Sequence, residues 1–290
     1  MSEFGDADRP SLSVVVITRN EAEDLPGFLT NFSAIADEII IIDDGSEDKT
    51  EAIAKAYGGN VKFISAKRTG DEGFCDQRNK GVTAATCDWL LQVDCDMRLT
   101  GELADEIRVA IQEFGKKAYR FRLRQYFLSH ECRHGGLQYW NQPWLSRRNA
   151  IRWTQKLHER AHIDAPEDNI GQLSNRMVHL NDADFSERMR KNYQYSHLEA
   201  ERLLSSNKPI RLWHVFTKPF WRAFRSYVLM RGFLDGQIGF VWSLYQFTGT
   251  ANAYFLAWEK ANRRPRSELE QKYTDSLSHS QTSQIDSVNV

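Results

Sequence analysis

The chain has 290 residues, of which 41% are hydrophobic and 27% are charged, and its formal net charge is -1. This length and composition are typical of a globular protein with one large domain or two smaller ones. The balanced charge excludes binding to nucleic acid through an overall basic surface. We therefore expect no nucleic-acid partner, and any basic patch must be local.

The cysteines and the chain ends bear on the cellular compartment. The cysteines are Cys75, Cys87, Cys95 and Cys132. They form no C-x-x-C pair and no cluster with zinc-ligand spacing, so we expect reduced thiols in a cytoplasmic protein. Residues 1–10 are acidic and polar, lack the pattern of a secretory signal and are predicted to be flexible. Residues 266–290 are rich in Ser, Gln and Asp, which predicts a disordered tail.

Strand and helix patterns alternate through residues 12–94. Apolar, β-branched runs predict strands at residues 12–18, 38–43, 61–65 and 88–94. Helical patterns are predicted within residues 19–36, 50–59 and 75–87, and the second of these ends in two glycines. This alternation predicts an α/β fold with a doubly wound, mostly parallel sheet.

Polar residues follow the predicted strands. They are Thr18, Arg19, Asn20, Asp43, Asp44, Arg68, Asp94 and Asp96. Ligands bind beyond the carboxyl ends of parallel strands, so polar residues at four such ends predict a binding site. Neither G-x-G-x-x-G nor G-x-x-x-x-G-K-[ST] occurs in the chain. A bound diphosphate would therefore need a countercharge other than a glycine-rich loop.

Asp94 and Asp96 flank Cys95 at the end of the fourth predicted strand. Two carboxylates at this spacing suit Mg²⁺, which proteins hold with one or two carboxylates together with substrate phosphates. The metal would then supply the missing countercharge. A D-x-D pair by itself is more often two solvated aspartates in a turn, so the pair needs support from the surrounding sequence.

Three segments supply that support. They are VVVITRNEAEDLPGFL, EIIIIDDGSEDKTEAIA and QRNKGVTAATCDWLLQVDCD, in this order along the chain. Together they resemble the family-2 glycosyltransferases, whose fold is called GT-A. The resemblance covers Leu12 to about Leu99. It implies a GT-A-type sheet with a nucleotide-binding N-terminal half and a sugar nucleotide as the donor.

The resemblance also implies residue roles. The nucleotide-binding residues would be Thr18, Asn20, Glu21, Asp43, Asp44, Arg78 and Asp94. Asp43 would contact the base, and Thr18 would line its pocket. Asp94 and Asp96 would contact the ribose and a Mg²⁺ or Mn²⁺ ion. The alternatives are a turn or helix cap at Asp43 and a solvated helix charge at Arg78.

The second half of the chain has a different pattern. Residues 116–128 alternate apolar and basic side chains, which predicts a strand with a basic face. Residues 130–163 are dense in His, Arg and Trp. Aromatic faces stack on sugars and arginines bind phosphates, so this cluster predicts an anionic saccharide acceptor held by Trp140, Arg147 and His158. The alternative is an edge strand with solvated arginines.

Segments KLHERAHI, RMVHLNDADFSERMRKNYQYSHLEAE and FRSYVLMRGFLDGQIGF resemble one branch of the family, the bacterial lipopolysaccharide core glucosyltransferases. The branch implies transfer of glucose from a UDP-sugar donor, UDP-glucose, to a lipopolysaccharide-core or other lipid-linked acceptor. Inversion needs a base for the acceptor hydroxyl, for which Glu159 is the candidate, and His179 would complete the metal site. The alternatives are a surface ion pair at Glu159 and a structural His179. The match departs at NYQYS, which has one residue more than the N-x-Y-S of the branch.

The predicted domains are a flexible N-terminus (1–10), a GT-A domain (11–180, with a nucleotide-sugar half at 11–115 and an acceptor half at 116–180), a helical region (181–265) and the tail (266–290). Within the helical region, residues 218–236 combine aromatic and basic side chains. Residues 236–258 carry no charge but are too polar for a bilayer span. This region predicts an anchor on the cytoplasmic face of the inner membrane, or a surface that packs on the catalytic domain or in a homodimer.

The predicted activity is metal-dependent, inverting glycosyl transfer. Sugar-phosphate nucleotidyltransferases are an alternative, but they carry a glycine-rich loop after the first strand, where this chain has TRNEAED. A non-catalytic, membrane-associated binder of sugar nucleotides is a third possibility. The intact D-x-D and HE segments count against it.

Overall fold

The computed structural model describes residues 9–154, 160–181, 184–206, 209–271 and 273–274. The chain divides into two compact units. The first unit comprises residues 1–190 and 224–244, and the second unit comprises residues 191–223 and 245–290.

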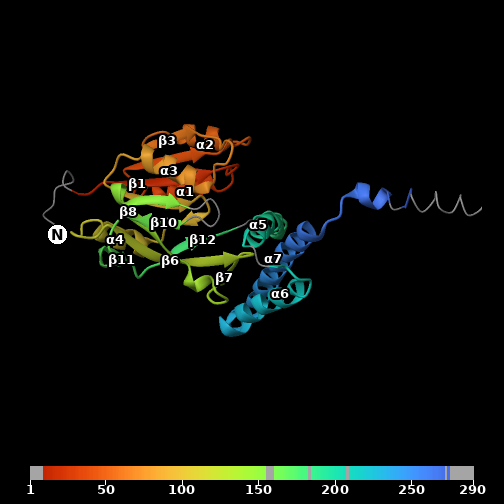
Figure 1. Cartoon of the computed structure of the whole chain (residues 1–290). Helices are drawn as coiled ribbons and strands as arrows, with labels where there is room; N and C mark the ends of the chain where they lie inside the picture. The colour runs from red at the N-terminus through yellow and green to blue at the C-terminus, as the bar shows by residue number, and fades with distance from the viewer. Residues whose placement is uncertain (1–8, 155–159, 182–183, 207–208, 272, 275–290) are drawn as a thin grey trace, which may run out of the picture. The chain divides into compact units, whose positions relative to one another are not determined.

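The described part of the first unit contains a ten-stranded mixed sheet. Its strands are β1 (Leu12–Thr18), β2 (Glu38–Asp43), β3 (Val61–Ser65), β4 (Trp89–Asp94), β5 (Met97–Arg98), β6 (Ala118–Phe127), β7 (His130–Cys132), β8 (Asn141–Arg147), β11 (Ile170–Gln172) and β12 (Met177–His179). The main order is β3-β2-β1-β4-β8-β6-β12-β5, and β7 and β11 pair with β6 (Figure 1). A separate antiparallel pair is formed by β9 (Ile151–Thr154) and β10 (Arg160–Ile163).

Helices cover the sheet and form the C-terminal region. The first unit contains α1 (Leu25–Phe32), α2 (Thr50–Tyr57), α3 (Phe74–Ala84) and α4 (Gly101–Ala110), with short 3-10 turns η1 (Leu137–Tyr139), η2 (Arg148–Ala150) and η3 (Glu167–Asn169). The C-terminal region contains α5 (Phe185–Ser205), α6 (His214–Phe224), a π-helical turn η4 (Arg225–Leu229), a 3-10 turn η5 (Gly232–Asp235) and α7 (Gly236–Asn262).

The strands predicted from residues 12–94 are confirmed. β3, β2, β1 and β4 pair in parallel, and every residue of β2 is buried, as expected for a strand covered on both faces. The parallel order ends at β4, because β8 runs antiparallel beside it and β6 runs antiparallel beside β8. The four parallel strands therefore lie within residues 11–115, for which the sequence predicts nucleotide-sugar binding, and the sheet as a whole is mixed.

Close approach of α3 to the sheet depends on Gly81. A Cβ atom at this position would lie 2.3 Å from Cγ1 of Val15 on β1, far inside van der Waals contact. Glycine lets the backbone of α3 approach β1 directly. The helix residues that precede Gly81 are thereby held close to the sheet.

β6 has the alternation that the sequence predicts. Tyr119, Phe121 and Leu123 are buried, whereas Arg122 and Arg124 are exposed. The strand therefore contributes one face to the core and presents a basic face outward, and Gln125 occupies the inward register after Leu123.

Three findings concern the remaining sequence predictions. All four cysteines are buried free thiols. The predicted disordered tail begins at residue 266, but residues 266–271 are helical, and Arg266 pairs with Glu270 one turn later at 2.8 Å. Among the described residues, none of the helices has the length and apolar character needed to cross a bilayer.

Candidate active site

The carboxyl ends of β1, β2 and β4 lie side by side. Thr18 is in register with Asp43 across β1 and β2, and Ile17 is in register with Asp94 across β1 and β4. The polar residues after these strands are therefore brought to one edge of the sheet, as the sequence predicts.

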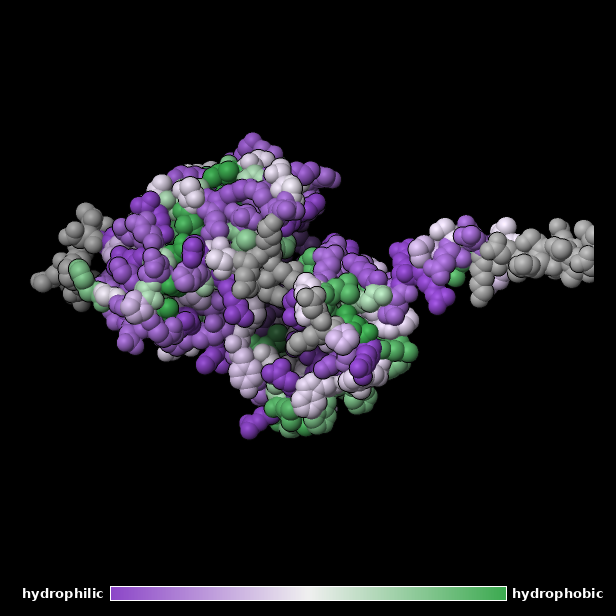
Figure 2. Space-filling model, viewed as in Figure 1, coloured by the Kyte–Doolittle hydropathy of each residue, from purple (hydrophilic) through white to green (hydrophobic). Residues whose placement is uncertain are grey.

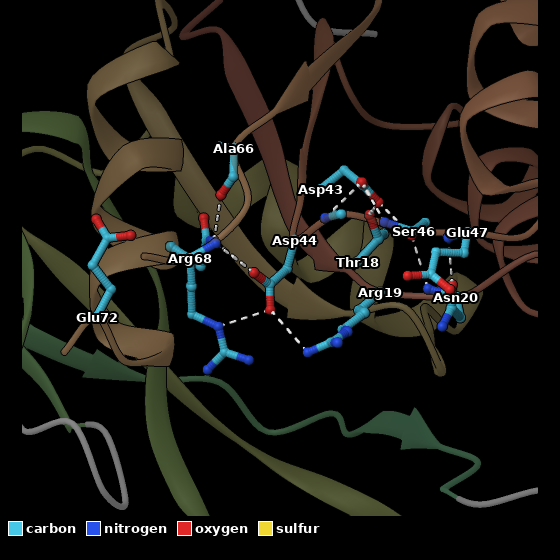
Figure 3. Close-up of polar contacts among 12 residues, drawn as sticks. Thr18, Arg19, Asn20, Asp43, Asp44, Ser46, Glu47, Ala66, Arg68 and Glu72 are labelled. Carbon is cyan, nitrogen blue, oxygen red and sulfur yellow. Dashed lines mark hydrogen bonds and ion pairs between the residues drawn. The ribbon is translucent and has the colours of Figure 1, made fainter. Parts of the chain in front are cut away.

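Asp43 holds the turn that follows β2 (Figure 3). Its Oδ1 accepts hydrogen bonds from Thr18 Oγ1 at 3.0 Å and from the Ser46 hydroxyl. Its Oδ2 accepts from the backbone N–H groups of Gly45 and Ser46 at 3.0 and 2.9 Å. A carboxylate has about four acceptor positions, so local donors occupy the capacity of Asp43. These bonds match the turn-forming alternative, and contact of Asp43 with a base stays a prediction.

Asp44 lies between two arginines (Figure 3). It accepts hydrogen bonds at 2.7 Å from both the backbone N–H and Nε of Arg68, and Nη1 of Arg19 lies 3.8 Å from its Oδ2. Burial disfavours the charged form of Asp44, but the hydrogen bonds from Arg68 outweigh burial and lower the pKa of this carboxyl group. Asp44 is therefore a charged group that gathers two guanidinium groups at the sheet edge.

Asn20 and Glu21 join the first loop to the second. Asn20 has a left-handed backbone (φ 59°), which asparagine tolerates better than most residues do. Its Oδ1 accepts from the backbone N–H of Glu47 at 2.8 Å. The backbone N–H of Glu21 donates to Thr50 Oγ1 at 2.8 Å. Both residues thus keep the loop after β1 against the turn after β2.

Asp94, Asp96 and His179 form a cluster. One ligand atom of each lies within 4.8 Å of the others, and Nε2 of His179 lies 3.1 Å from Oδ2 of Asp96. The pairing of β12 with β5 explains the position of the histidine, because His179 is in register with Met97, directly after Asp96. The chain's two predicted acids and its predicted histidine therefore meet in space.

The surroundings of His179 suit a metal ligand. Nδ1 of His179 lies 2.9 Å from Oε1 of Gln125, which also accepts from Nδ2 of Asn181 at 3.1 Å. A proton on Nδ1 leaves Nε2 to face the acids, and metal-binding histidines usually have such a partner on the other ring nitrogen. Burial opposes a charge on His179, but Asp96 outweighs burial, and the pKa of the imidazole is raised. Two carboxylates and an imidazole fit a divalent cation.

Arg78 positions Asp94. Its Nη2 donates to Asp94 Oδ1 at 2.6 Å, and its guanidinium lies 4.7 Å from the ring centre of Trp153. Asn79 lies within α3, one residue after Arg78. Its side chain exchanges two hydrogen bonds of 2.9 and 2.8 Å with the backbone of Trp153. These contacts attach α3 to β9 beside Asp94.

The predicted acceptor residues lie in different places. Arg147 is in register with Trp89, at the end of β4 opposite to Asp94, and its guanidinium stacks 4.4 Å from the Trp89 ring centre. The sequence prediction therefore misplaces Arg147, because β8 carries it away from the site edge. Trp140 precedes β8 at the end nearer Asp94 by register, and its side chain is exposed.

The remaining two candidates, His158 and Glu159, lie outside the described residues. The described residues on either side of 155–159, Thr154 and Arg160, pair across β9 and β10 next to Trp153.

Gln125 was not among the predicted site residues. A signal for it exists in the sequence, because it is a polar residue in the inward register of an otherwise apolar strand face. Its partner His179 was predicted, but the contact between them depends on the parallel pairing of β6 with β12, which residue patterns alone do not specify.

The chain is similar to known proteins in sequence. The family model described as Glycosyl transferase family 2 matches residues 13–162, slightly more than half of the chain. An uncharacterized glycosyltransferase of Rickettsia conorii is 24% identical over 249 residues, which cover 80% of this chain and 84% of that protein. The lipopolysaccharide core biosynthesis glycosyltransferase LpsC of Rhizobium meliloti is 27% identical, over 92% of this chain and 98% of LpsC. Among solved structures, S. aureus TarS 1-349 is 17% identical with a TM-score of 0.45, covering 88% of this chain and 92% of that chain.

Proposed function

The chain belongs to glycosyl transferase family 2, and from this premise we propose that it moves glucose from UDP-glucose to a lipopolysaccharide core or another lipid-linked, anionic saccharide. Glycosyl transfer itself follows from the family. The donor, the acceptor and inversion at the anomeric carbon are the proposed part.

The observation that carries the proposal is the cluster of Asp94, Asp96 and His179 at the carboxyl edge of the parallel strands. These residues would hold Mg²⁺ or Mn²⁺, which when bound offsets negative charge on the departing diphosphate. Arg78 holds Asp94 in position through its 2.6 Å hydrogen bond. Gln125 orients the imidazole ring of His179.

The nucleotide would bind beside this cluster, over the loops after β1 and β2. Asp43 keeps the turn in shape by bonding Thr18, Gly45 and Ser46, so its contribution to the base pocket is structural. Asp44 and its two arginines lie at the same edge and supply the charged groups of the pocket.

The acceptor hydroxyl would lose its proton to Glu159. A carboxylate base at this position lets the oxygen attack the anomeric carbon on the face opposite to the diphosphate, so the configuration inverts without a covalent enzyme intermediate. Support comes from the HE segment of the sequence and from the place of its flanking residues, Thr154 and Arg160, next to the Trp153 that stacks on Arg78.

The acceptor class rests on sequence similarity. LpsC is named for lipopolysaccharide core biosynthesis, and its similarity to this chain covers nearly the whole length of both. The exposed ring of Trp140, at the end of β8 nearer Asp94, is available to stack on an acceptor sugar.

Release of UDP from UDP-glucose by the purified protein tests the proposal. We expect slow release that requires Mn²⁺ or Mg²⁺, stops on chelation and is lost in Asp96→Ala. Asp105→Ala is the matched control, because Asp105 lies on the surface and pairs with Arg108. Faster release of nucleotide from GDP- or dTDP-sugars than from UDP-glucose would contradict UDP-glucose as the donor. Formation of pyrophosphate from UTP and glucose 1-phosphate would show a nucleotidyltransferase, and tight binding without turnover would show a binder.

A further inference from the structure

The helix α6 exposes a row of aromatic side chains. Trp213, at the residue before the helix, and Phe216 and Phe220 within it are 52%, 64% and 72% exposed. Spacings of three and four residues place them on one face of the helix. Val215 and Pro219, on another face, are buried, so the aromatic row is not the face that packs inward.

Contacts within the second unit fix this orientation. His214 packs its ring 6.1 Å from Tyr254, and Phe220 meets Phe247 edge-on at 6.5 Å, both on α7. The helix is therefore docked along α7 while its aromatic row stays largely in solvent. Figure 2 shows hydrophobic side chains at the surface of these C-terminal helices.

The charged residues in the sequence segment around the aromatic row are all basic. No Asp or Glu occurs between Glu201 and Asp235, although the chain as a whole is nearly neutral. The same stretch contains seven basic residues: Arg202, Lys208, Arg211, Lys218, Arg222, Arg225 and Arg231. Arg211 and Lys218 are exposed. Lys218 lies three residues before the exposed ring of Trp221, so it flanks that ring and not Phe216 or Phe220.

These properties favour a lipid surface over a second copy of the chain. A two-fold dimer through α6 would bring the basic segments of the two copies close together, and like charges repel. An anionic headgroup layer attracts the basic residues, while aromatic rings enter the boundary between headgroups and acyl chains. Exposed apolar clusters rimmed by polar groups are uncommon on proteins without a partner.

We propose that residues 211–224, with Trp213, Phe216 and Phe220 on one face and the exposed basic residues Arg211 and Lys218 nearby in the same segment, bind the surface of an anionic phospholipid bilayer. The helix lies in the plane of the headgroups and does not cross the membrane. This inference depends on neither the donor sugar nor the metal.

Flotation of the full-length protein with vesicles tests the proposal. We expect binding to vesicles that contain phosphatidylglycerol, weak binding to pure phosphatidylcholine, and loss of binding at high salt. Phe216→Ser with Phe220→Ser should lower the partition coefficient by about tenfold or more. Arg211→Glu with Lys218→Glu should lower it about tenfold for anionic vesicles and little for neutral ones. Phe114→Ser with Lys117→Glu is the matched control, because Phe114 is fully exposed in the first unit.

The thermal melting of each variant and its UDP-glucose hydrolysis should match those of the unaltered protein, since these side chains are exposed. No flotation of the unaltered protein with anionic vesicles would overturn the proposal. Flotation that survives the double serine change would overturn it too. A fall from dimer to monomer mass in the serine variant, without vesicle binding by the unaltered protein, would show instead that the face joins two copies.

Discussion

Nε2 of His179 lies 3.1 Å from Oδ2 of Asp96, which brings the end of β12 to the loop after β4. On the other side of the imidazole ring, Nδ1 lies 2.9 Å from Oε1 of Gln125, which orients the ring. The third member of the cluster, Asp94, is held by Arg78. A second residue therefore orients the side chains of Asp94 and His179. The backbone of Asp96 is held by the N–H group of Leu180, which donates to its carbonyl oxygen at 3.0 Å.

Replacement of Gln125 by Met should weaken metal binding while keeping the volume of the side chain. The imidazole of His179 would lose its Nδ1 partner, and loss of such a partner typically costs about 10–100-fold in metal affinity. Titration with Mn²⁺, followed by its paramagnetic signal, measures the change. Gln172→Met is the control, because Gln172 bonds Asn141 away from the cluster. Equal Mn²⁺ affinities in the two variants would show that Gln125 does not orient a ligand.

Replacement of Asp43 and of Asp44 by asparagine should have different effects, the first on stability and the second on UDP binding. Asp43→Asn places an amide N–H group toward donors that now bond a carboxylate, so the free energy of unfolding should fall by about 1–3 kcal/mol. Asp44→Asn should weaken UDP binding about tenfold through loss of a charged group at the pocket edge. Urea denaturation and calorimetric titration with UDP measure the two effects. A tenfold loss of UDP affinity in Asp43→Asn without loss of stability would restore a direct base contact for Asp43.

Removal of the proposed general base, Glu159, should lower the rate of glycosyl transfer without changing the affinity for the donor. In Glu159→Gln, kcat should fall by about 10²–10⁴-fold, the usual contribution of a general base, while the Kd for UDP-glucose stays the same. Steady-state kinetics with an acceptor saccharide give kcat, and equilibrium titration gives Kd. Glu167→Gln is the control, since Glu167 pairs with Arg120 on the surface. An unchanged kcat would remove Glu159 from this role.

The parallel half of the fold could be predicted because its signals are local. β-Branched runs at β1 and β2, and the polar residues that end them, specify buried strands and their carboxyl ends. The place of β8 could not be predicted, because antiparallel insertion between β4 and β6 depends on pairings between distant segments. This explains the error at Arg147, which belongs to an aromatic and basic segment whose register carries it to the far end of β4.

The site, like the fold, could be predicted only in part. Asp94, Asp96 and His179 were found from residue type and resemblance, and the structure brings them together. The function of Asp43 was less accessible, because a carboxylate that binds a ligand and one that holds a turn look alike in sequence. The structure adds four hydrogen bonds, from Thr18 and the turn, that match the turn-forming role, while the base contact stays a prediction.

Glu38 should make the first unit less stable at acidic pH than at neutral pH. Its carboxylate accepts hydrogen bonds at 2.6 Å from Ser13 Oγ, Lys62 Nζ and the backbone N–H of Thr86. Burial raises the pKa of Glu38, but these hydrogen bonds outweigh burial and lower the pKa from 4.5 to about 2. The folded state therefore binds this proton less readily than the unfolded state does.

The sign of the effect follows from that difference. A lowered folded-state pKa stabilises the protein fully above pH 4.5, and the contribution is lost as the pH falls from 4.5 toward 2. The loss should amount to about 2–3 kcal/mol, since one pKa unit corresponds to about 1.4 kcal/mol. Urea denaturation at about pH 7 and about pH 3 measures it. Glu38→Gln should be less stable at neutral pH and should show a smaller drop between the two conditions, whereas Asp105→Asn, at an exposed site, should keep the full drop. The same acid sensitivity in Glu38→Gln as in the unaltered protein would assign the effect to other carboxyl groups.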